Sequence, residues 1–167
     1  MEGNGMYKKN DIVVYKRDVC KVVGKVRSDF TGEQCYILVP YFKSDGSVKM
    51  QVPVSNKGGH LRDLITKEDV DRLLDEADDI QTLANKPANM KSQYATLLKE
   101  DDLESLICII KTSYGRNRAR LEQNKKKASI DDEYLQKAEK YLFEEMSVVL
   151  GISYEEAKEY FIRRINR

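Results

Sequence analysis

The sequence predicts an α+β protein. A small, strongly bent β sheet or barrel over residues 1–65 is followed by an all-helical bundle of about four to five helices over residues 66–167. Two observations predict this plan. Short segments rich in Val and Ile alternate with turn residues in the first third of the chain, and apolar residues recur at helical spacing in the remainder. The pattern changes after Gly58-Gly59, so we expect the junction of the two modules near residue 65.

The first module contains four segments with the composition of strands. Gly32 can adopt the positive φ of a turn between the second and third segments, and Asp45-Gly46 suits a tight hairpin turn before the fourth. Four or five short strands in about sixty residues favour a small bent sheet or barrel. The expected strands are 11–16, 19–26, 34–42 and 47–54.

The last expected strand contains a proline. Because Pro53 has no N–H to donate, it belongs on an edge strand or near a strand end. We therefore expect strand 47–54 to be an edge, whose open hydrogen-bonding side can receive a strand from another protein. Its apolar face carries Val48, Met50, Val52 and Val54, and its other face carries Lys49, Gln51 and Pro53.

Capping signals mark the helices of the second module. Asp101 or Asp102 can open the third helix, and Gly151 can end the fourth. The apolar stripes are typical of a bundle core; those of the second and third helices include Met90, Tyr94, Leu103, Leu106, Ile107, Ile110 and Tyr114. The expected helix-start boxes are Thr66 with Asp69, Ser129 with Asp132, and Ser153 with Glu156.

Composition and motifs argue against a membrane protein, a metal site and an enzyme. No apolar run approaches the ~20 residues that span a bilayer, and the N-terminus lacks the apolar stretch of a signal peptide, so we expect a cytoplasmic protein. Cys20, Cys35 and Cys108 lie in apolar patterns without a CxxC, which indicates buried thiols. His60, the single histidine, has no nucleophile motif beside it. We expect no catalytic residue, metal or cofactor.

One short segment carries most of the positive charge. The chain has a net charge of +1, yet residues 111–128 hold seven basic residues and a single acid, Glu122, which gives this segment +6. Such a block forms either a solvated face or a contact with phosphates. Nothing in it suits base reading, so DNA contact would depend on backbone and shape. The candidate DNA-binding residues are Arg116, Arg118, Arg120, Lys125, Lys126 and Lys127.

Five segments also carry a resemblance to a known family. They are KKNDIVVYK (8–16), TGEQCYIL (31–38), VKMQVPVSN (48–56), LRDLI (61–65) and QYATLLKEDDLESLICIIKTSY (93–114). In this order and spacing the chain resembles the CarD-type, or CdnL-like, bacterial transcription regulators. Their N-terminal module is shared with the RNA-polymerase-interacting domain of the transcription-repair coupling factor.

The resemblance implies a function in transcription. It implies a Tudor-like N-terminal domain whose edge strand pairs with the β subunit of RNA polymerase, here through Lys49, Gln51 and Pro53. It also implies a helical domain placed against promoter DNA at the upstream edge of the melted bubble, where the family stabilises the open complex without reading a sequence. We expect a monomer that associates with the nucleoid through RNA polymerase.

The sequence departs from the family at several positions. Lys16-Arg17 stands where a His-Gly or similar pair is usual, and Gln51 stands where a basic residue is common. The chain has no tryptophan, although a tryptophan wedges at the DNA fork in the family. Its place falls at Met90, an apolar side chain that can also wedge between bases. Met90 and Lys91 therefore join the candidate DNA-binding residues.

Two hypotheses stay open. The first is a non-enzymatic regulator that binds RNA polymerase through the N-terminal edge strand and promoter DNA through the basic segment. The second is a protein adaptor that binds RNA polymerase or another partner without functional DNA contact. The missing tryptophan favours the adaptor, and the +6 segment favours the regulator.

Overall fold

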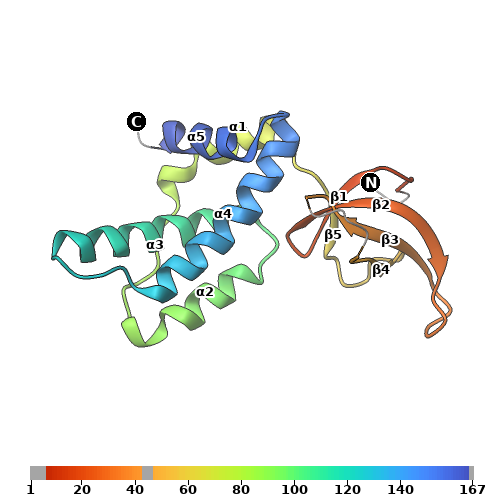
Figure 1. Cartoon of the computed structure of the whole chain (residues 1–167), viewed down its shortest axis with the longest axis horizontal. Coiled ribbons are helices and arrows are strands. Elements are labelled where there is room, and N and C mark those ends of the chain that lie inside the picture. Colours follow the sequence, from red (N-terminus) through yellow and green to blue (C-terminus); the bar gives the residue numbers. More distant parts are fainter. Residues whose placement is uncertain (1–6, 43–46, 166–167) are drawn as a thin grey trace. The chain divides into compact units, whose positions relative to one another are not determined.

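A five-stranded antiparallel sheet followed by five α-helices makes up the structure, which confirms the α+β prediction (Figure 1). The structure is a computed structural model that describes residues 7–42 and 47–165. The chain divides into two units, Met1–Leu64 and Ile65–Arg167, called below the β unit and the helical unit.

The β unit is an open sheet. Its strands run in the spatial order β4-β3-β2-β1-β5, so β4 and β5 are the two edges and, within the described residues, do not pair with each other. Of the two sequence-based alternatives, the bent sheet is therefore the one found. The strands are β1 (Ile12–Tyr15), β2 (Asp18–Arg27), β3 (Gln34–Pro40), β4 (Met50–Pro53) and β5 (Leu61–Asp63).

Local sequence explains most of the strand connections. Lys16 and Arg17 form the two-residue turn between β1 and β2, with φ of 47° and 75°, the positive values that such a hairpin turn requires. The long strand β2 carries a register shift between Val22 and Gly24, which increases its bend. The predicted hairpin turn at Asp45-Gly46 lies outside the described residues. One face of the sheet buries Val13, Cys20, Val22, Tyr36, Leu38, Val52 and Leu61.

Among the described residues, five α-helices and two short 3₁₀ helices form the helical unit, and their ends follow four of the five predicted capping signals. Thr66 and Asp69 form a reciprocal capping box, and the side chain of Asp102 accepts from the N–H of Ser105 at 2.9 Å. Gly151 ends its helix with a φ of 69°. The helices are α1 (Lys67–Asp75), η1 (Ala77–Asp79), η2 (Pro87–Asn89), α2 (Met90–Leu98), α3 (Leu103–Glu122), α4 (Ser129–Leu150) and α5 (Tyr154–Ile165).

Two other predicted boxes have different outcomes. Ser153 and Glu156 form the expected box at the start of α5, with bonds of 3.0 and 3.1 Å. The box expected at Ser129 and Asp132 does not form, because α4 starts directly after Ala128 without a side-chain cap. Asp132 instead accepts a hydrogen bond from the side chain of Asn117 at 3.0 Å.

The core of the helical unit lies between α3, α4 and the shorter helices. The N-terminal half of α3 is buried almost all round, whereas its C-terminal half buries only one side. The core prediction was wrong for Tyr114, whose side chain is 60% exposed. All three cysteines are buried, as expected, and burial raises the pKa of the Cys108 thiol.

Candidate functional site

The edge strand β4 presents an open backbone edge. Within residues 7–42 and 47–165 it pairs only with β3, in a register that places Val52 opposite Tyr36 and Pro53 opposite Cys35. This outcome confirms that the strand containing Pro53 is an edge. Within Met50–Pro53, Val52 is buried and Gln51 is exposed, as the predicted alternation requires. The strand is shorter than the predicted range 47–54, and Val48, which precedes it, is exposed.

The direction of the backbone groups along β4 follows from one hydrogen bond. The N–H of Val54 donates to the carbonyl of Gln34 at 2.9 Å, so in the alternating antiparallel pattern Val52 faces β3 and Gln51 and Pro53 face outward. Pro53 has no N–H, and its carbonyl accepts from the N–H of Asn56 at 3.0 Å. The backbone N–H and carbonyl of Gln51 are therefore the groups of β4 that can pair with a further strand.

The opposite edge, β5, is closed by side chains of the same unit. Asn56 bonds both outward groups of Leu61: its Nδ2 donates to the carbonyl at 2.9 Å, and its Oδ1 accepts from the N–H at 3.2 Å. The guanidinium of Arg62 donates to the outward carbonyl of Asp63 at 3.0 Å. Asn56 thus replaces a neighbouring strand, a common way to protect an edge from unwanted pairing. The two edges of the sheet therefore differ: among the described residues, side chains bond the outward backbone groups of β5, whereas the outward N–H and carbonyl of Gln51 in β4 stay open to a partner.

Replacing Asn56 with alanine is expected to open the β5 edge. The variant loses the two hydrogen bonds to Leu61, and alanine tolerates the φ of 52° at this position less well than asparagine. We expect the β unit to lose about 1–3 kcal/mol of stability and the protein to self-associate at high concentration. Urea unfolding and light scattering measure these effects; Asn124→Ala, which also has positive φ but caps a helix, is the control.

Exposed apolar side chains lie before and after the connection between β3 and β4. Tyr41 and Phe42 follow β3, pack edge to face with ring centroids 5.0 Å apart, and are both exposed. Val48, just before β4, is exposed as well. Lys49 and Gln51 are the next polar positions along the chain, and Lys49 is exposed. Exposed apolar groups beside an open strand edge are typical of protein-binding surfaces.

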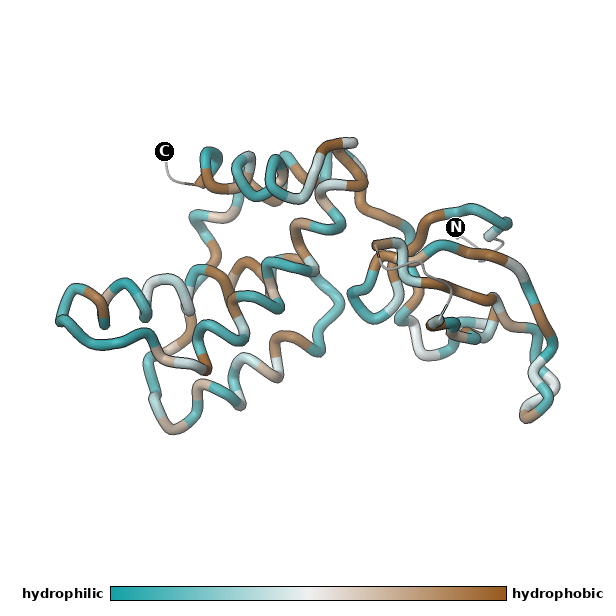
Figure 2. The backbone as a smooth tube through the Cα atoms, in the orientation of Figure 1, coloured by the Kyte–Doolittle hydropathy of each residue, from teal (hydrophilic) through white to brown (hydrophobic). Residues whose placement is uncertain are grey.

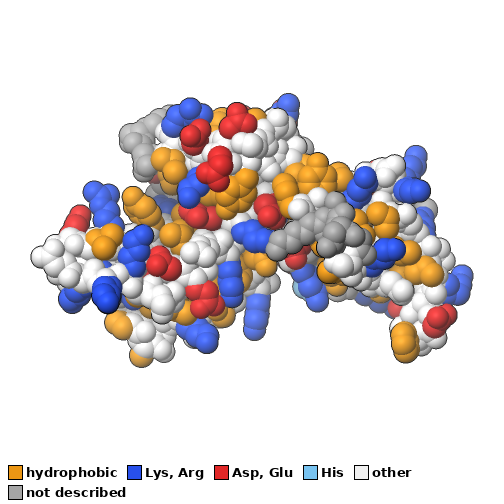
Figure 3. Space-filling view, in the orientation of Figure 1, with side chains coloured by type: hydrophobic (Ala, Val, Ile, Leu, Met, Phe, Trp, Pro, Cys, Tyr) orange, Lys and Arg blue, Asp and Glu red, His pale blue; other side chains and the backbone are white. Residues whose placement is uncertain are grey.

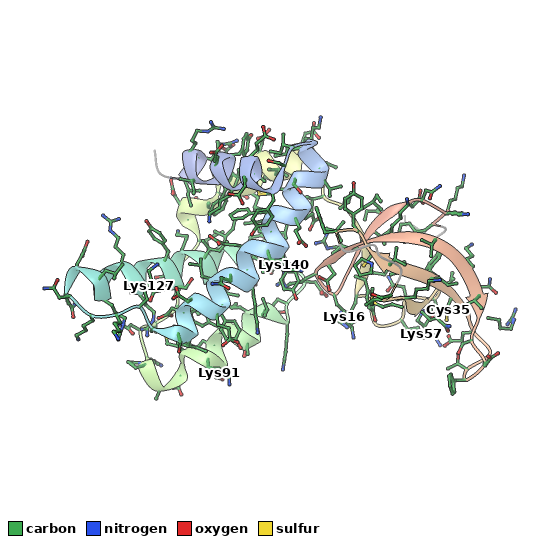
Figure 4. The ribbon with its side chains drawn as sticks, viewed as in Figure 1. Lys16, Cys35, Lys57, Lys91, Lys127 and Lys140 are labelled. Carbon is green, nitrogen blue, oxygen red and sulfur yellow. The ribbon has the colours of Figure 1, made fainter. Side chains whose placement is uncertain are left out.

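The DNA-wedge hypothesis for Met90 is wrong. The Met90 side chain is 0% exposed and belongs to the core of the helical unit. Because α2 turns this residue inward, it cannot insert between bases without unpacking the helix. Its neighbour Lys91 is exposed on α2 and keeps its candidate role (Figure 4).

The candidate role of Arg116 must also be corrected. Its side chain is only 15% exposed, and its Nε donates to both oxygens of the fully buried Asp131, at 3.0 and 3.2 Å. The Tyr94 hydroxyl donates to the same carboxylate at 2.5 Å, and burial together with this bond raises the pKa of Tyr94. Arg116 also bonds the side chain of Asn85. Arg116 therefore neutralises a carboxylate inside the helical unit and is not available to phosphates.

The remaining basic residues gather at the end of α3, a region that we call the basic tip. It comprises Arg118 and Arg120 on α3 and Lys125, Lys126 and Lys127 on the following loop. Figure 2 shows this connection to α4 as mostly hydrophilic. The Arg118 side chain is 70% exposed, and all three lysines are exposed. These are the predicted DNA-binding residues that the structure brings together.

Backbone hydrogen bonds fix the shape of the basic tip. Asn124 adopts a φ of 59°, and the N–H groups of Asn124 and Lys125 donate to the carbonyls of Leu121 and Arg120, at 3.0 and 2.8 Å. This is the Schellman ending of a helix. The side chain of Arg120 donates to the carbonyl of Lys126 at 2.8 Å, so Arg120 holds the loop. The lysines are presented on an ordered turn.

Sequence reasoning missed two parts of these surfaces. Asn56 closes the β5 edge, but a single asparagine after a strand has no pattern that distinguishes this role from a turn residue. Lys111 was counted with the basic segment, yet its ammonium donates to the carbonyls of Ala77 and Ile80 at 2.8 and 2.7 Å and holds η1 in place.

No model of a protein family matches the chain, and no curated protein matches it either. The similarity to CarD-type regulators therefore depends on the segments quoted above and stays a prediction. Among the described residues, no helix is long and apolar enough to cross a membrane, and no three His, Cys, Asp or Glu side chains are grouped as metal ligands.

Proposed function

We propose that the protein is a non-enzymatic regulator of bacterial transcription. The β4 edge binds the β subunit of RNA polymerase by strand addition, and the basic tip contacts promoter DNA without sequence specificity. Together the two contacts change the stability of the open promoter complex. The observation that carries this proposal is the asymmetry of the sheet: Asn56 and Arg62 close the β5 edge, and β4 keeps an outward-facing backbone at Gln51.

The DNA contact depends on the charge of the basic tip. Lys111 and Arg116 bond groups inside the helical unit. The exposed positive charge of residues 111–128 therefore comes from the basic tip, where the negative charge of Glu122 opposes it. Point charges on an ordered turn suit phosphates, and none of them is arranged to read base edges. Once the β4 edge holds the protein on the polymerase, the effective concentration of the tip near DNA reaches roughly millimolar, so a weak contact suffices.

The protein adaptor is the second candidate. The burial of Met90 favours it, because the position that corresponds to the family's wedge cannot reach DNA. In this case the basic tip contacts an acidic protein surface. The lifetime of open promoter complexes, with and without the protein, separates the two functions, since an adaptor leaves it unchanged.

Salt dependence tests the DNA contact directly. If the basic tip meets about four phosphates, log affinity for a duplex falls with log salt at a slope of about −3.6. Replacing Lys125, Lys126 and Lys127 together with alanine is expected to reduce the slope to about −0.9, because about three contacts are lost. Fluorescence anisotropy of a labelled duplex over a range of salt concentrations measures both slopes.

The matched control changes the same charge elsewhere. Lys8, Lys67 and Lys99 are exposed and lie outside the basic tip, so their replacement with alanine should leave the slope near that of the unmodified protein. An equal change in both triple variants would show that net charge, and not the basic tip, governs binding.

A further inference from the structure

The C-terminal half of α3 leaves one broad face uncovered. From Tyr114 onward, the buried side of the helix is reduced to Asn117, with Arg116 and Arg120 partly covered. Figure 3 shows Lys and Arg side chains over this end of the helical unit with hydrophobic side chains between them. The exposed residues on this half of α3 are Tyr114, Gly115, Arg118, Ala119, Leu121 and Glu122.

Tyr114 and its neighbours form an apolar and cationic stripe. Residues 114, 118 and 121 follow the i, i+4, i+7 spacing that places side chains on one side of a helix. Tyr114 is 60% exposed and Leu121 is 51% exposed, so the structure leaves an aromatic residue in water beside Arg118. The ion pair between Arg118 and Glu122 has a 3.4 Å separation, and both side chains are about 70% exposed, so it is weak and can be exchanged for another anion.

Gly115 lies beside this stripe without a packing reason. A Cβ at this position would meet nothing within 4 Å, and the glycine adopts no positive φ. Glycine within a helix is unfavourable compared with alanine. One turn later stands Ala119, so the side of the helix that carries Gly115 and Ala119, next to the stripe, has no side chain larger than a methyl group. A glycine in such a place permits the close approach of another molecule's backbone.

The stripe leads into the lysines of the basic tip. From Tyr114 to Glu122 the helix extends about 12 Å, and the Schellman turn then presents Lys125, Lys126 and Lys127. Along the helix, the exposed ring of Tyr114 is thus followed by the bare surface at Gly115 and Ala119 and then by the lysines of the basic tip. Polyanions with planar, exposed rings are complementary to this arrangement, because bases stack on aromatic side chains and phosphates meet the cations.

We propose that this face of α3 binds single-stranded nucleic acid, with one unpaired base stacked on Tyr114 and the adjoining phosphates on Arg118 and the basic tip. Gly115 and Ala119 let the strand approach the helix. In a duplex the faces of the bases are stacked on one another, so its phosphates can contact the lysines of the basic tip but its bases cannot stack on Tyr114. The inference rests on the proposed DNA contact of the basic tip and adds to it a selection for unpaired strands.

The test compares a labelled single strand with its duplex, using the full-length protein at fixed salt. Tyr114→Ala is expected to weaken single-strand binding about tenfold, the effect of one lost base–aromatic stack, and to leave duplex binding unchanged. Tyr114→Phe should keep the single-strand affinity. Phe30→Ala removes another exposed aromatic side chain, on the β unit, and should change neither affinity.

Gly115→Leu separates binding from stability. A Cβ has open space at this position and leucine favours a helix more than glycine does, so the variant should unfold at a higher temperature while its single-strand affinity falls. Single-strand affinity that is unchanged in both Tyr114→Ala and Gly115→Leu would overturn the inference. Equal losses for single strand and duplex would also overturn it, since they would show no role in stacking.

Two further outcomes are decisive. If the triple lysine variant loses duplex binding while Tyr114→Ala changes nothing, the proposed function stands and the stacking inference fails; if neither variant changes binding, both fail. A polyglutamate peptide is the probe for an acidic protein partner. Tyr114-dependent binding of this peptide, with Tyr114-independent binding of the single strand, would assign the face to such a partner and refute the inference.

Discussion

Replacing Arg116 with alanine is expected to destabilise the helical unit by about 3–5 kcal/mol at neutral pH. The variant leaves the carboxylate of Asp131, which is 0% exposed, without its counter-charge. The Tyr94 hydroxyl remains as a donor at 2.5 Å, but one neutral hydrogen bond does not offset the cost of a buried charge. Urea unfolding followed by the circular dichroism of the helices measures the loss.

A second substitution shows whether the buried charge is the cause. Adding Asp131→Asn to Arg116→Ala removes the charge and keeps an acceptor for Tyr94, so the double variant should recover much of the stability. Glu133→Ala is the control for a surface ion pair, because Glu133 and Lys137 are both about half exposed; its expected cost is below about 1 kcal/mol. A loss below about 1 kcal/mol in Arg116→Ala, or no recovery in the double variant, would contradict this description of the core.

The same substitution distinguishes the two kinds of basic residue in the segment 111–128. Arg116→Ala should reduce stability while the salt slope of DNA binding stays unchanged in the folded protein. The lysines of the basic tip should behave in the opposite way, since their side chains are exposed on an ordered turn. The +6 charge of residues 111–128 is thus divided by the structure into a buried structural part and an exposed part available for binding.

Local signals were sufficient to predict the ends of several elements. The capping box of Thr66 and Asp69, the cap of Asp102 and the positive φ of Gly151 each involve residues within a few positions of one another. Pro53 likewise predicted an edge strand, because the missing N–H constrains the strand that contains it. The strand β5 escaped prediction because its three residues are too few for a pattern to be recognised.

The candidate site was harder to predict because it depends on contacts between distant residues. Helical spacing placed both Met90 and Tyr114 in the core, and the structure confirms this for Met90 but exposes Tyr114. The wedge role of Met90, which requires an exposed side chain, came from the resemblance alone. Helical spacing places a residue on a face of its helix, but which face is covered depends on packing between helices. In the same way, the partner of Arg116 is Asp131, on the next helix, and no local pattern identifies this pair.

Replacing Gln51 with proline is expected to abolish strand addition at the β4 edge without unfolding the β unit. Gln51 has the same outward direction as Pro53, so its N–H makes no bond to β3, and a proline there follows the pattern already present in the strand. The change removes the outward donor and places a ring where a partner strand would pair. Capture of RNA polymerase from a bacterial extract by the immobilised full-length protein should fall at least about tenfold, with the β subunit as the readout.

Two neighbouring substitutions make this test specific for the backbone. Gln51→Ala changes the side chain but keeps the N–H, so capture should persist; an equal loss in this variant would assign binding to the glutamine amide instead. Val52→Pro removes an N–H that faces β3 and brings a proline into a buried position, so it should destabilise the β unit itself. A Gln51→Pro variant that folds and still captures polymerase would refute strand addition at β4, because among the described residues no other backbone N–H of that strand faces outward.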